Sequence, residues 1–367
     1  MNFELQRVFI EEEFRGGRMA RRVVARLPSH VPVDYVADGR PAARADASQP
    51  DPFAAGKRRL ILMRRRSPFL MACPAGSGEF ACCGYLVLTL ASNCPMDCAY
   101  CFLQEYVADN PGFQIYANYA DAFDELDALA RKAPLRNFRV GTGELADSLA
   151  FDSLTGLSLD LVDFFARQRN LTLEFKTKTD EIENLLTVDP NGQVIVSWTL
   201  SPHAVFTGSE HRSASPAARI NAARRLAQAG YVVAFHLDPV IAYPAAERDY
   251  LELIDHLFAS VAPPSIRFIS IGGLRMNPRL RAAARRRFPT DPMLAGEEVL
   301  SPDGRYRTFT PLRARLFRLL SERIKRQAPN LAVYLCMESA TMSERIFGAR
   351  PPAPANLGQL LAAPSPR

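Results

Sequence analysis

Short apolar runs alternate with longer amphipathic stretches through the middle of the chain. The amphipathic stretches carry apolar residues at helical spacing and predict helices at Ala120–Ala133, Ser158–Arg169, Asp180–Leu186, Pro216–Ala229, Ala246–Ser260 and Leu312–Arg326. The apolar runs predict strands at Tyr85–Leu90, Phe138–Val140, Leu173–Lys176, Val194–Thr199, Val232–Leu237 and Ile266–Ile271. Strands that alternate with helices indicate parallel βαβ units, so the pattern predicts an α/β fold with a partial, six-stranded barrel.

The chain on either side of this repeat predicts extensions to the barrel. Residues 1–79 form an N-terminal region, in which Val31–Phe53 is rich in Pro, Ala, Asp and Gly and predicts a loose surface segment. Within the same region, Arg58–Met63 predicts a strand. We therefore expect the partial barrel to occupy residues 80–275 and a basic C-terminal α/β extension to occupy residues 276–367.

The composition is that of a soluble globular protein. The chain has 367 residues, of which 48% are hydrophobic, and charges interrupt every apolar segment before it reaches the length of a membrane helix. The N-terminus lacks a basic flank followed by an apolar core, and the 7 cysteines then predict a reducing, cytoplasmic compartment. A net charge of +6 and a pI of about 9.0 favour an anionic partner.

Three cysteines stand close together directly after the first predicted repeat strand. Cys94, Cys98 and Cys101 are separated by three and then two residues. Three thiolates at a strand end can hold three irons of a cubic [4Fe-4S] cluster, which leaves the fourth iron open for a small molecule. The alternatives are zinc, for which Cys82 and Cys83 are the nearest additional ligands, a redox dithiol, and simple packing of buried thiols.

Polar residues also follow several of the other predicted strands, where the chemistry of such a barrel is located. Glu144, in the glycine-containing loop 141–148, can accept hydrogen bonds from a ligand ammonium group, and Lys178 is a cation at a strand end. Arg275 follows a glycine pair and can face a substrate, and Cys336 is the cysteine of the C-terminal half that can approach the mouth. A lone His236 within a strand predicts a core residue rather than a ligand.

The cysteine spacing, followed by the aromatic Phe102, resembles the signature of radical SAM enzymes. The wider context, CCGY at 82–85 and NCPMDCAYCFLQ at 93–104, looks like the spore photoproduct lyase family, and the likeness extends from about Val8 to Glu338. The resemblance implies that the cluster's open iron chelates S-adenosylmethionine (SAM). It also implies reductive cleavage of SAM to a 5'-deoxyadenosyl radical, with an electron donor such as flavodoxin or ferredoxin.

The resemblance assigns roles to further residues around the cofactor. Gly143-Glu144 is similar to the segment that holds the methionine amine, and Lys178 lies in a Thr-Lys pair that meets the methionine carboxylate. Ser197 matches a serine that contacts the cofactor, and Asp238 lies at the cofactor edge. Glu210 and Arg212 resemble a polar segment that precedes the next helix, and an ion pair between them is the alternative.

Two positions depart from the pattern of the family. The family carries a cysteine just after the second strand that gives a hydrogen atom to the repaired thymine, and Glu144 stands at that position. Of the two tyrosines that the family places in the cluster loop, Tyr100 is retained as a catalytic candidate beside the cofactor, and Phe102 replaces the other. Both residues are expected to contact the cofactor, but Phe102 cannot relay a hydrogen atom. The departures predict retained cofactor chemistry with poor repair of spore photoproduct, and Cys336 is the alternative donor if repair occurs.

A basic window late in the chain predicts contact with nucleic acid. From Arg275 to Arg326 there are 14 Lys/Arg against 5 Asp/Glu. Within it, Arg305, Tyr306 and Arg307 follow a Gly304 turn and fit a short hairpin whose cations meet phosphates and whose ring stacks on a base. The resemblance likewise places a DNA-contacting hairpin late in the chain. The other possibilities are a solvated helical face, a radical SAM enzyme with a different substrate, and a DNA-binding protein whose cluster is structural.

Overall fold

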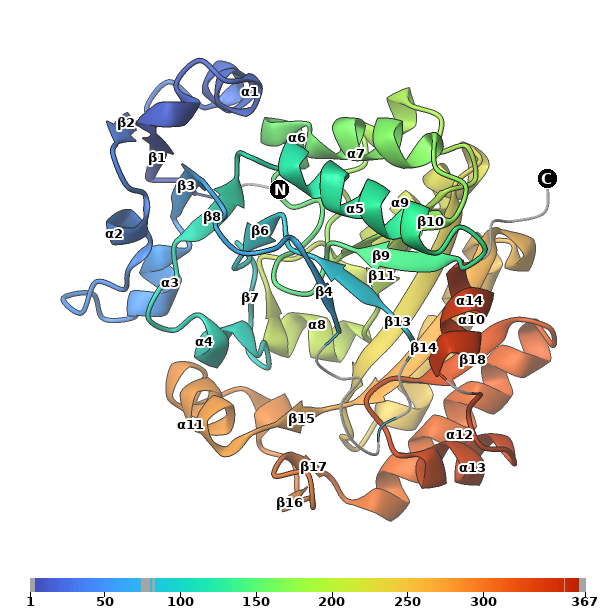
Figure 1. The fold of residues 1–367 in the computed structure, drawn as a ribbon. Coiled ribbons are helices and arrows are strands. Elements are labelled where there is room, and N and C mark those ends of the chain that lie inside the picture. Colours follow the sequence, from blue (N-terminus) through green and yellow to red (C-terminus); the bar gives the residue numbers. More distant parts are fainter. Residues whose placement is uncertain (1–3, 74–79, 81–82, 353, 363–367) are drawn as a thin grey trace.

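Two sheets organise the computed structural model, which describes residues 4–73, 80, 83–352 and 354–362. The larger sheet has eight strands in the order β18-β14-β13-β11-β10-β9-β5-β4. Figure 1 shows it as a curled sheet with helices packed along its outer side. Its strands are β4 (Leu70–Ala72), β5 (Leu86–Leu88), β9 (Phe138–Gly141), β10 (Leu171–Thr177), β11 (Val194–Thr199), β13 (Val232–Val240), β14 (Ile266–Gly273) and β18 (Ala332–Leu335).

The predicted partial barrel is confirmed. The strands β5, β9, β10, β11, β13 and β14 are neighbours in that order, and every adjacent pair is parallel. One strand extends this set at each edge: β18 pairs parallel with β14, and β4 pairs antiparallel with β5. Because parallel strands place their carboxyl ends at one edge, the loops that follow them meet at a common mouth.

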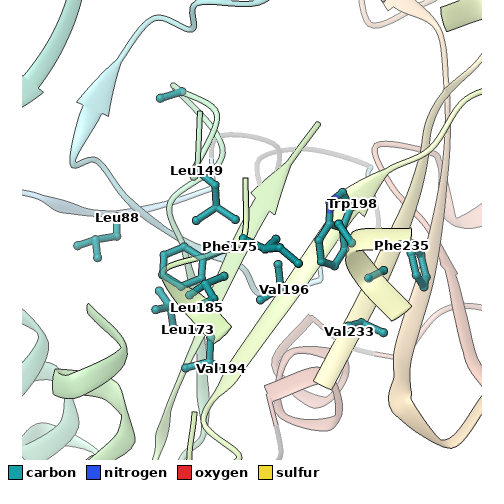
Figure 2. Packing of buried hydrophobic residues seen from close by; sticks show 14 of the residues in the cluster. Leu88, Leu149, Leu173, Phe175, Leu185, Val194, Val196, Trp198, Val233 and Phe235 are labelled. Carbon is teal, nitrogen blue, oxygen red and sulfur yellow. The ribbon is translucent and has the colours of Figure 1, made fainter. Parts of the chain in front are cut away.

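Residues alternate between the two faces of this sheet. Figure 2 shows the outer-face set, in which Phe175, Trp198 and Phe235 pack with neighbouring aliphatic side chains, and all three are fully buried. The residues one position away on each strand, such as Glu174, Ser197 and His236, belong to the opposite, inner face. The outer face therefore supplies the hydrophobic core, and the inner face supplies the polar interior of the barrel.

Helices cover the outer side and close one end. The long helices are α5 (Ala120–Lys132), α7 (Leu157–Ala166), α9 (Pro216–Gln228), α10 (Ala246–Ser260) and α12 (Thr310–Gln327). The C-terminal helix α14 (Pro354–Ala362) takes a different place: Leu357 and Leu361 pack against the inner-face residues Ile195, Ala234 and Phe268. We conclude that α14 fills the barrel interior away from the mouth.

The predicted helix at Asp180–Leu186 is wrong. The structure has only a single 3-10 turn, Leu185–Thr187, in this segment. Its apolar residues Ile182 and Leu185 are buried, and the Asn184 amide donates to the backbone oxygen of Asp152 at 2.9 Å. The apolar residues whose spacing predicted a helix are therefore buried by contacts with other parts of the chain, without a helical backbone. The strand predicted at Tyr85–Leu90 is also shorter than expected, because only Leu86–Leu88 stays in the sheet.

The N-terminal region contains most of a second sheet, with strand order β2-β1-β3-β8-β6. Its strands are β1 (Arg7–Glu11), β2 (Val33–Val36), β3 (Arg59–Met63), β6 (Ala91–Ser92) and β8 (Phe113–Tyr116). The segment Val31–Phe53 is therefore not loose throughout, since β2 pairs parallel with β1 and the short helices α2 (Arg40–Ala43) and α3 (Pro52–Gly56) fall in or border it. Two strands, β6 and β8, come from beyond residue 79, so the sheet crosses the predicted domain boundary.

The C-terminal extension begins with a small antiparallel sheet. Its strands are β15 (Arg275–Met276), β16 (Glu298–Leu300) and β17 (Tyr306–Thr308), in the order β15-β17-β16. The predicted hairpin is present as β16 and β17, and Gly304 in the turn has a φ of 74°. Helix α11 (Pro278–Arg287) precedes the hairpin, and α12, β18 and α13 (Ala340–Phe347) follow it.

Candidate active site

The cysteine loop lies at the mouth, beyond the carboxyl end of β5. After β6 the chain turns at Asn93, which has a φ of 70° and a side-chain oxygen that accepts a hydrogen bond from the amide of Cys94 at 2.8 Å. The strand β7 (Asp97–Cys98) then pairs with β12 (Glu210–His211), which places Cys98 opposite Glu210. The amide of Cys101 donates to the carbonyl of Cys98 at 3.1 Å and closes the turn.

The three thiols belong to one apolar cluster, in which Cys98 is buried and Cys94 and Cys101 are half-buried. Cys94, Cys98 and Cys101 pack together with Met96 and Ala150. Burial raises the pKa of Cys94 above its usual value and that of Cys98 to about 11, although the Lys178 ammonium partly offsets the effect at Cys98. Deprotonation therefore needs a bound cation to compensate for burial, and a metal or cluster supplies such a charge.

The donor set fits a cluster better than a single metal ion. Within the described part of the chain, no group of three or more His, Cys, Asp or Glu side chains is arranged to hold one ion. Each thiolate of a cubic cluster binds a different iron, so the three sulfurs are not required to converge on one point. A neighbouring cation also suits this use, because the Lys178 ammonium lies 3.8 Å from the Cys98 sulfur.

Lys178 belongs to a buried ion-pair network centred on Glu210. Glu210 accepts from the Lys178 ammonium at 3.1 Å, from Arg219 at 2.5 Å and from the Ser201 hydroxyl at 2.7 Å. Burial alone would raise the pKa of Glu210, but Lys178 and Arg219 outweigh it and hold the pKa far below its usual value. The alternative of a Glu210–Arg212 pair is therefore wrong, because the partner of Glu210 is Arg219, on helix α9.

Tyr100 joins the same network from the cysteine loop. Its hydroxyl donates to Glu210 and accepts from the Lys178 ammonium at 2.5 Å, and that ammonium lies 4.6 Å from the ring centroid. Burial raises the pKa of Tyr100 well above its usual value, so the phenol stays protonated. Phe102, two residues further along the loop, is 39% exposed and contacts Tyr106 with ring centroids 6.0 Å apart.

A polar layer crosses the barrel interior below the mouth. The Glu174 carboxylate accepts from the Ser197 hydroxyl at 2.7 Å, contacts His236 at 2.9 Å and pairs with Arg139 at 3.1 Å. His236 also contacts the Ser270 hydroxyl at 2.6 Å. The prediction of a core histidine agrees with this placement. Ser197 is fully buried and faces Glu174, so the structure places it below the mouth rather than at an open cofactor surface.

This layer predicts a loss of stability in acid. Burial lowers the pKa of His236 to about 4, so the folded protein keeps the imidazole neutral where an unfolded chain protonates it. The depressed pKa means that stability is present above about pH 6.5 and is lost as the pH falls to about 4, by on the order of 3 kcal/mol. Burial raises the pKa of Glu174, but Arg139 and His236 outweigh it and bring it to about 2, which adds a loss below pH 4.5.

Urea unfolding at pH 7 and pH 5 measures this effect. We expect His236→Gln to remove most of the pH dependence between these values, whereas His256→Gln, at an exposed position on α10, leaves it unchanged. Equal pH dependence in the wild type and His236→Gln would show that His236 does not carry the effect.

A second group of charged residues lies at the mouth itself. Asp238, on β13, pairs with Arg275 at 2.8 Å, and the guanidinium also donates to the carbonyl of Gly273 at 2.9 Å. Burial raises the pKa of Asp238, but Arg275 outweighs it and lowers it to about 2. Cys336 follows β18 beside this pair, and its amide donates to Ile271 at 2.8 Å. Burial raises the pKa of Cys336, and the Asp238 charge adds to the effect, so the group remains a thiol.

The loop after β9 carries Glu144 and two closely packed glycines. A side chain at Gly141 would meet the Tyr85 ring, and one at Gly143 would come within 2.5 Å of the Lys176 side chain. These glycines therefore serve packing within the protein. The Tyr85 hydroxyl is buried and has no hydrogen-bond partner among the described residues. A buried donor without a partner beside this loop fits a site that a ligand completes.

The basic window divides into buried and exposed arginines. Arg307 is almost fully buried and pairs with Asp303 at 2.7 Å and Glu338 at 3.3 Å. Arg305 is more open, with 38% of its side chain exposed, and Tyr306 lies beneath Arg281 with 4.3 Å between the guanidinium and the ring centroid. The exposed positive charge of this window includes Arg279 and Arg286 of α11. Arg286 belongs to the run of three arginines at 285–287, whereas no motif marks Arg279 in the sequence.

Several residues of the site carried little signal in the sequence. Glu174 shares a strand face with Lys176 and could have been found by period-two spacing. Arg219 lies within a predicted helix, where nothing marks it as the partner of Glu210. Arg139 occupies a three-residue predicted strand, in which a cation would ordinarily be solvated. Cys82, a ligand in the zinc alternative, lies outside the described residues.

A curled, parallel half-barrel with a three-cysteine loop at its mouth defines the radical SAM class of enzymes. The chain belongs to the spore photoproduct lyase family, since the family model described as spore photoproduct lyase matches residues 54–286, more than half of the chain. A curated spore photoproduct lyase from Geobacillus sp. (strain Y412MC61) is 27% identical over 170 residues, which cover 46% of this chain and 50% of that relative. One from Clostridium acetobutylicum is 23% identical over 252 residues, which cover 68% and 72% of the two chains.

Solved structures share the fold along most of the chain. A spore photoproduct lyase complexed with dinucleoside spore photoproduct has a TM-score of 0.79 and 18% identity, covering 91% of this chain and 99% of that one. A mutant spore photoproduct lyase with bound AdoMet and dinucleoside spore photoproduct has a TM-score of 0.78 and 19% identity, covering 90% and 97%. At these identities the likeness establishes the architecture, including the C-terminal extension. No helix within the described ranges is long and apolar enough to cross a membrane.

Proposed function

We propose that this protein is a radical SAM enzyme that acts on a DNA lesion of the spore photoproduct kind. The observation that carries the proposal is the packing of Cys94, Cys98 and Cys101 in one cluster at the mouth of the half-barrel. These residues would hold a [4Fe-4S] cluster. When bound and reduced, the cluster supplies the electron that cleaves SAM to a 5'-deoxyadenosyl radical. The protein contributes binding, orientation and exclusion of water.

Residues of the mouth would bind the cofactor's amino acid part by charge. Glu144 is the proposed acceptor for the amine, because its half-buried side chain makes no hydrogen bond among the described residues. Lys178 is proposed for the carboxylate. Glu210 and Tyr100 already engage its ammonium, so Lys176 joins it as a candidate. Lys176 makes no ion pair with any described residue, and its charge helps to lower the pKa of Asp238. Ser197 and Asp238 would support the site through Glu174 and Arg275.

The substrate would enter from the C-terminal extension. The hairpin of β16 and β17 joins the mouth through β15, in which Arg275 stands opposite Arg307. We propose weak, salt-dependent contact with phosphates through the exposed arginines of this extension, including Arg305, with Tyr306 available to a base. The buried Arg307 would hold the hairpin through Asp303 and Glu338, so its own phosphate contact is not part of the proposal.

Cys336 is the proposed hydrogen-atom donor in place of the absent cysteine at position 144. In this step the S–H bond of Cys336 breaks, a C–H bond forms on the product radical, and a sulfur radical remains on Cys336. Glu144 cannot perform this step, because a carboxylate has no hydrogen atom to give and the O–H bond of a carboxylic acid is too strong for transfer to a carbon radical. The position of Cys336 beside Asp238 and Arg275 supports the assignment, since these groups mark the same mouth.

Repair of a synthetic spore photoproduct dinucleotide tests the lesion assignment. We expect the wild type to repair it slowly and, in deuterated buffer, to place one deuterium in the thymine, because a thiol exchanges its hydrogen with solvent. Cys336→Ala should lose this deuterium and most of the product.

The outcomes separate the two parts of the proposal. SAM cleavage by the wild type without any repaired dinucleotide would point to a different substrate. Unchanged deuterium incorporation in Cys336→Ala would instead exclude Cys336 as the donor while leaving the lesion assignment in place.

A further inference from the structure

Helix α11 is fastened to the cysteine loop by contacts at both of its ends. At its start, the side-chain amide of Asn277 donates to Glu105 at 2.9 Å, just beyond the last cysteine of the loop. Past its end, the Phe288 ring stacks on His211 of β12, with centroids 5.3 Å apart and planes inclined by 21°. Because β12 pairs directly with β7, these contacts reach the loop from two directions.

Arg287, the last residue of α11, makes the most extensive of these contacts. Its guanidinium donates twice to Asp97, at 3.0 and 2.8 Å, and once to the side-chain oxygen of Gln104 at 2.8 Å. A further bond runs from Nε to Asp51 at 2.8 Å. The Arg287 side chain is only 9% exposed and that of Asp97 only 11%, so the contacts are screened little by solvent.

The two loop residues that Arg287 joins lie on either side of the cysteines' turn. Asp97 directly precedes Cys98. Gln104 is buried, and its amide donates to the carbonyls of Ala99 at 2.8 Å and of Cys98 and Cys101 at 3.3 Å each. One side chain therefore holds three carbonyls of the turn, and its remaining oxygen is held by Arg287.

We propose that Arg287 is a positioning residue for the cysteine loop, which fixes the turn around Cys98 and Cys101 by bridging Asp97 and Gln104. The role requires the planar fork of arginine, because a lysine ammonium cannot donate to both partners in the same geometry. Lys57 supports the arrangement from the other side, since its buried ammonium donates to Asp97 at 3.0 Å and to the carbonyl of Met96. The proposal concerns the loop itself and holds whatever the substrate is.

Amide hydrogen exchange of residues 94–105 in the iron-free, full-length protein tests the proposal. We expect Arg287→Gln to speed amide exchange in this segment by about tenfold, because the hydrogen bonds from Arg287 to Asp97 and Gln104 are lost. The alkylation of Cys98 and Cys101 should become faster by a similar factor. Arg287→Lys should rescue little of this. The matched control is Arg286→Gln, since Arg286 is the exposed neighbour on the same helix and should leave exchange of the loop unchanged.

A second variant and a second measurement guard against general destabilisation. Gln104→Met keeps Arg287 and Asp97 and should also speed exchange in the loop, while exchange in α9 stays as in the wild type. In the cluster-loaded protein, both variants should release iron to a chelator faster and change the electron paramagnetic resonance spectrum of the reduced cluster. Wild-type exchange in Arg287→Gln, or full rescue by Arg287→Lys, would overturn the proposal.

Discussion

Changing Cys94, Cys98 or Cys101 to Ala is expected to abolish the brown chromophore of the anaerobically reconstituted protein. Each thiolate would bind a different iron of the proposed cluster, so the loss of one leaves two irons without protein ligands. The three thiols pack in one cluster, in which Cys98 is buried and Cys94 and Cys101 are half-buried. Iron content and visible absorption of each variant measure the effect.

Cys73→Ala is the matched control, because Cys73 directly follows strand β4 and lies outside the cysteine loop. It should keep the iron and the colour of the wild type. Iron that remains in the triple Cys94, Cys98 and Cys101 variant would refute the assignment, and one tightly bound zinc per chain would favour the zinc alternative.

Glu210→Gln is expected to cost about 3–5 kcal/mol of unfolding free energy, which is the usual effect of breaking a buried charge pair. The Glu210 carboxylate is fully buried between Lys178 and Arg219. Loss of its charge leaves two buried cations without a counter-charge, and the glutamine amide keeps only one of the two oxygens that accept from Tyr100, Ser201 and Arg219. The same change should loosen the cysteine loop, because Glu210 lies opposite Cys98 in the pairing of β12 with β7.

Urea denaturation at pH 7 gives the loss directly, and Glu183→Gln provides the comparison. Glu183 pairs with Arg225 at 2.8 Å, but its side chain is 71% exposed, so this change should cost less than about 1 kcal/mol. Equal losses in the two variants would mean that the buried network contributes no more than a surface ion pair.

The barrel could be predicted from the sequence because its buried strands and amphipathic helices leave strong apolar patterns along the chain. Strands β11 and β13 begin at their predicted residues, and helix α10 has its predicted bounds, since each is a strongly patterned segment. The cysteine loop was found for a different reason, because its residues are contiguous and their spacing has a chemical meaning. The predicted domain boundaries remain predictions.

The rest depended on contacts between distant segments, which spacing along the chain does not encode. Arg287 reaches a loop about 190 positions earlier. In the sequence it is one of three consecutive arginines in the basic window, which predicts a phosphate-binding surface or a solvated face rather than a buried bridge. From the sequence alone, Arg307 was expected to contact a phosphate. In the structure its side chain is buried and pairs with Asp303 and Glu338. Segment 180–186 was mistaken for a helix because buried Ile182 and Leu185 follow helical spacing without the backbone bonds.

The formation of 5'-deoxyadenosine from SAM by the reduced, cluster-loaded protein tests the central claim most directly. The account predicts that the wild type produces it once a chemical reductant is supplied, and that Cys98→Ala, treated in the same way, produces none. A wild-type protein that carries a full, reducible cluster and leaves SAM intact would contradict the account, and would identify the cluster as structural.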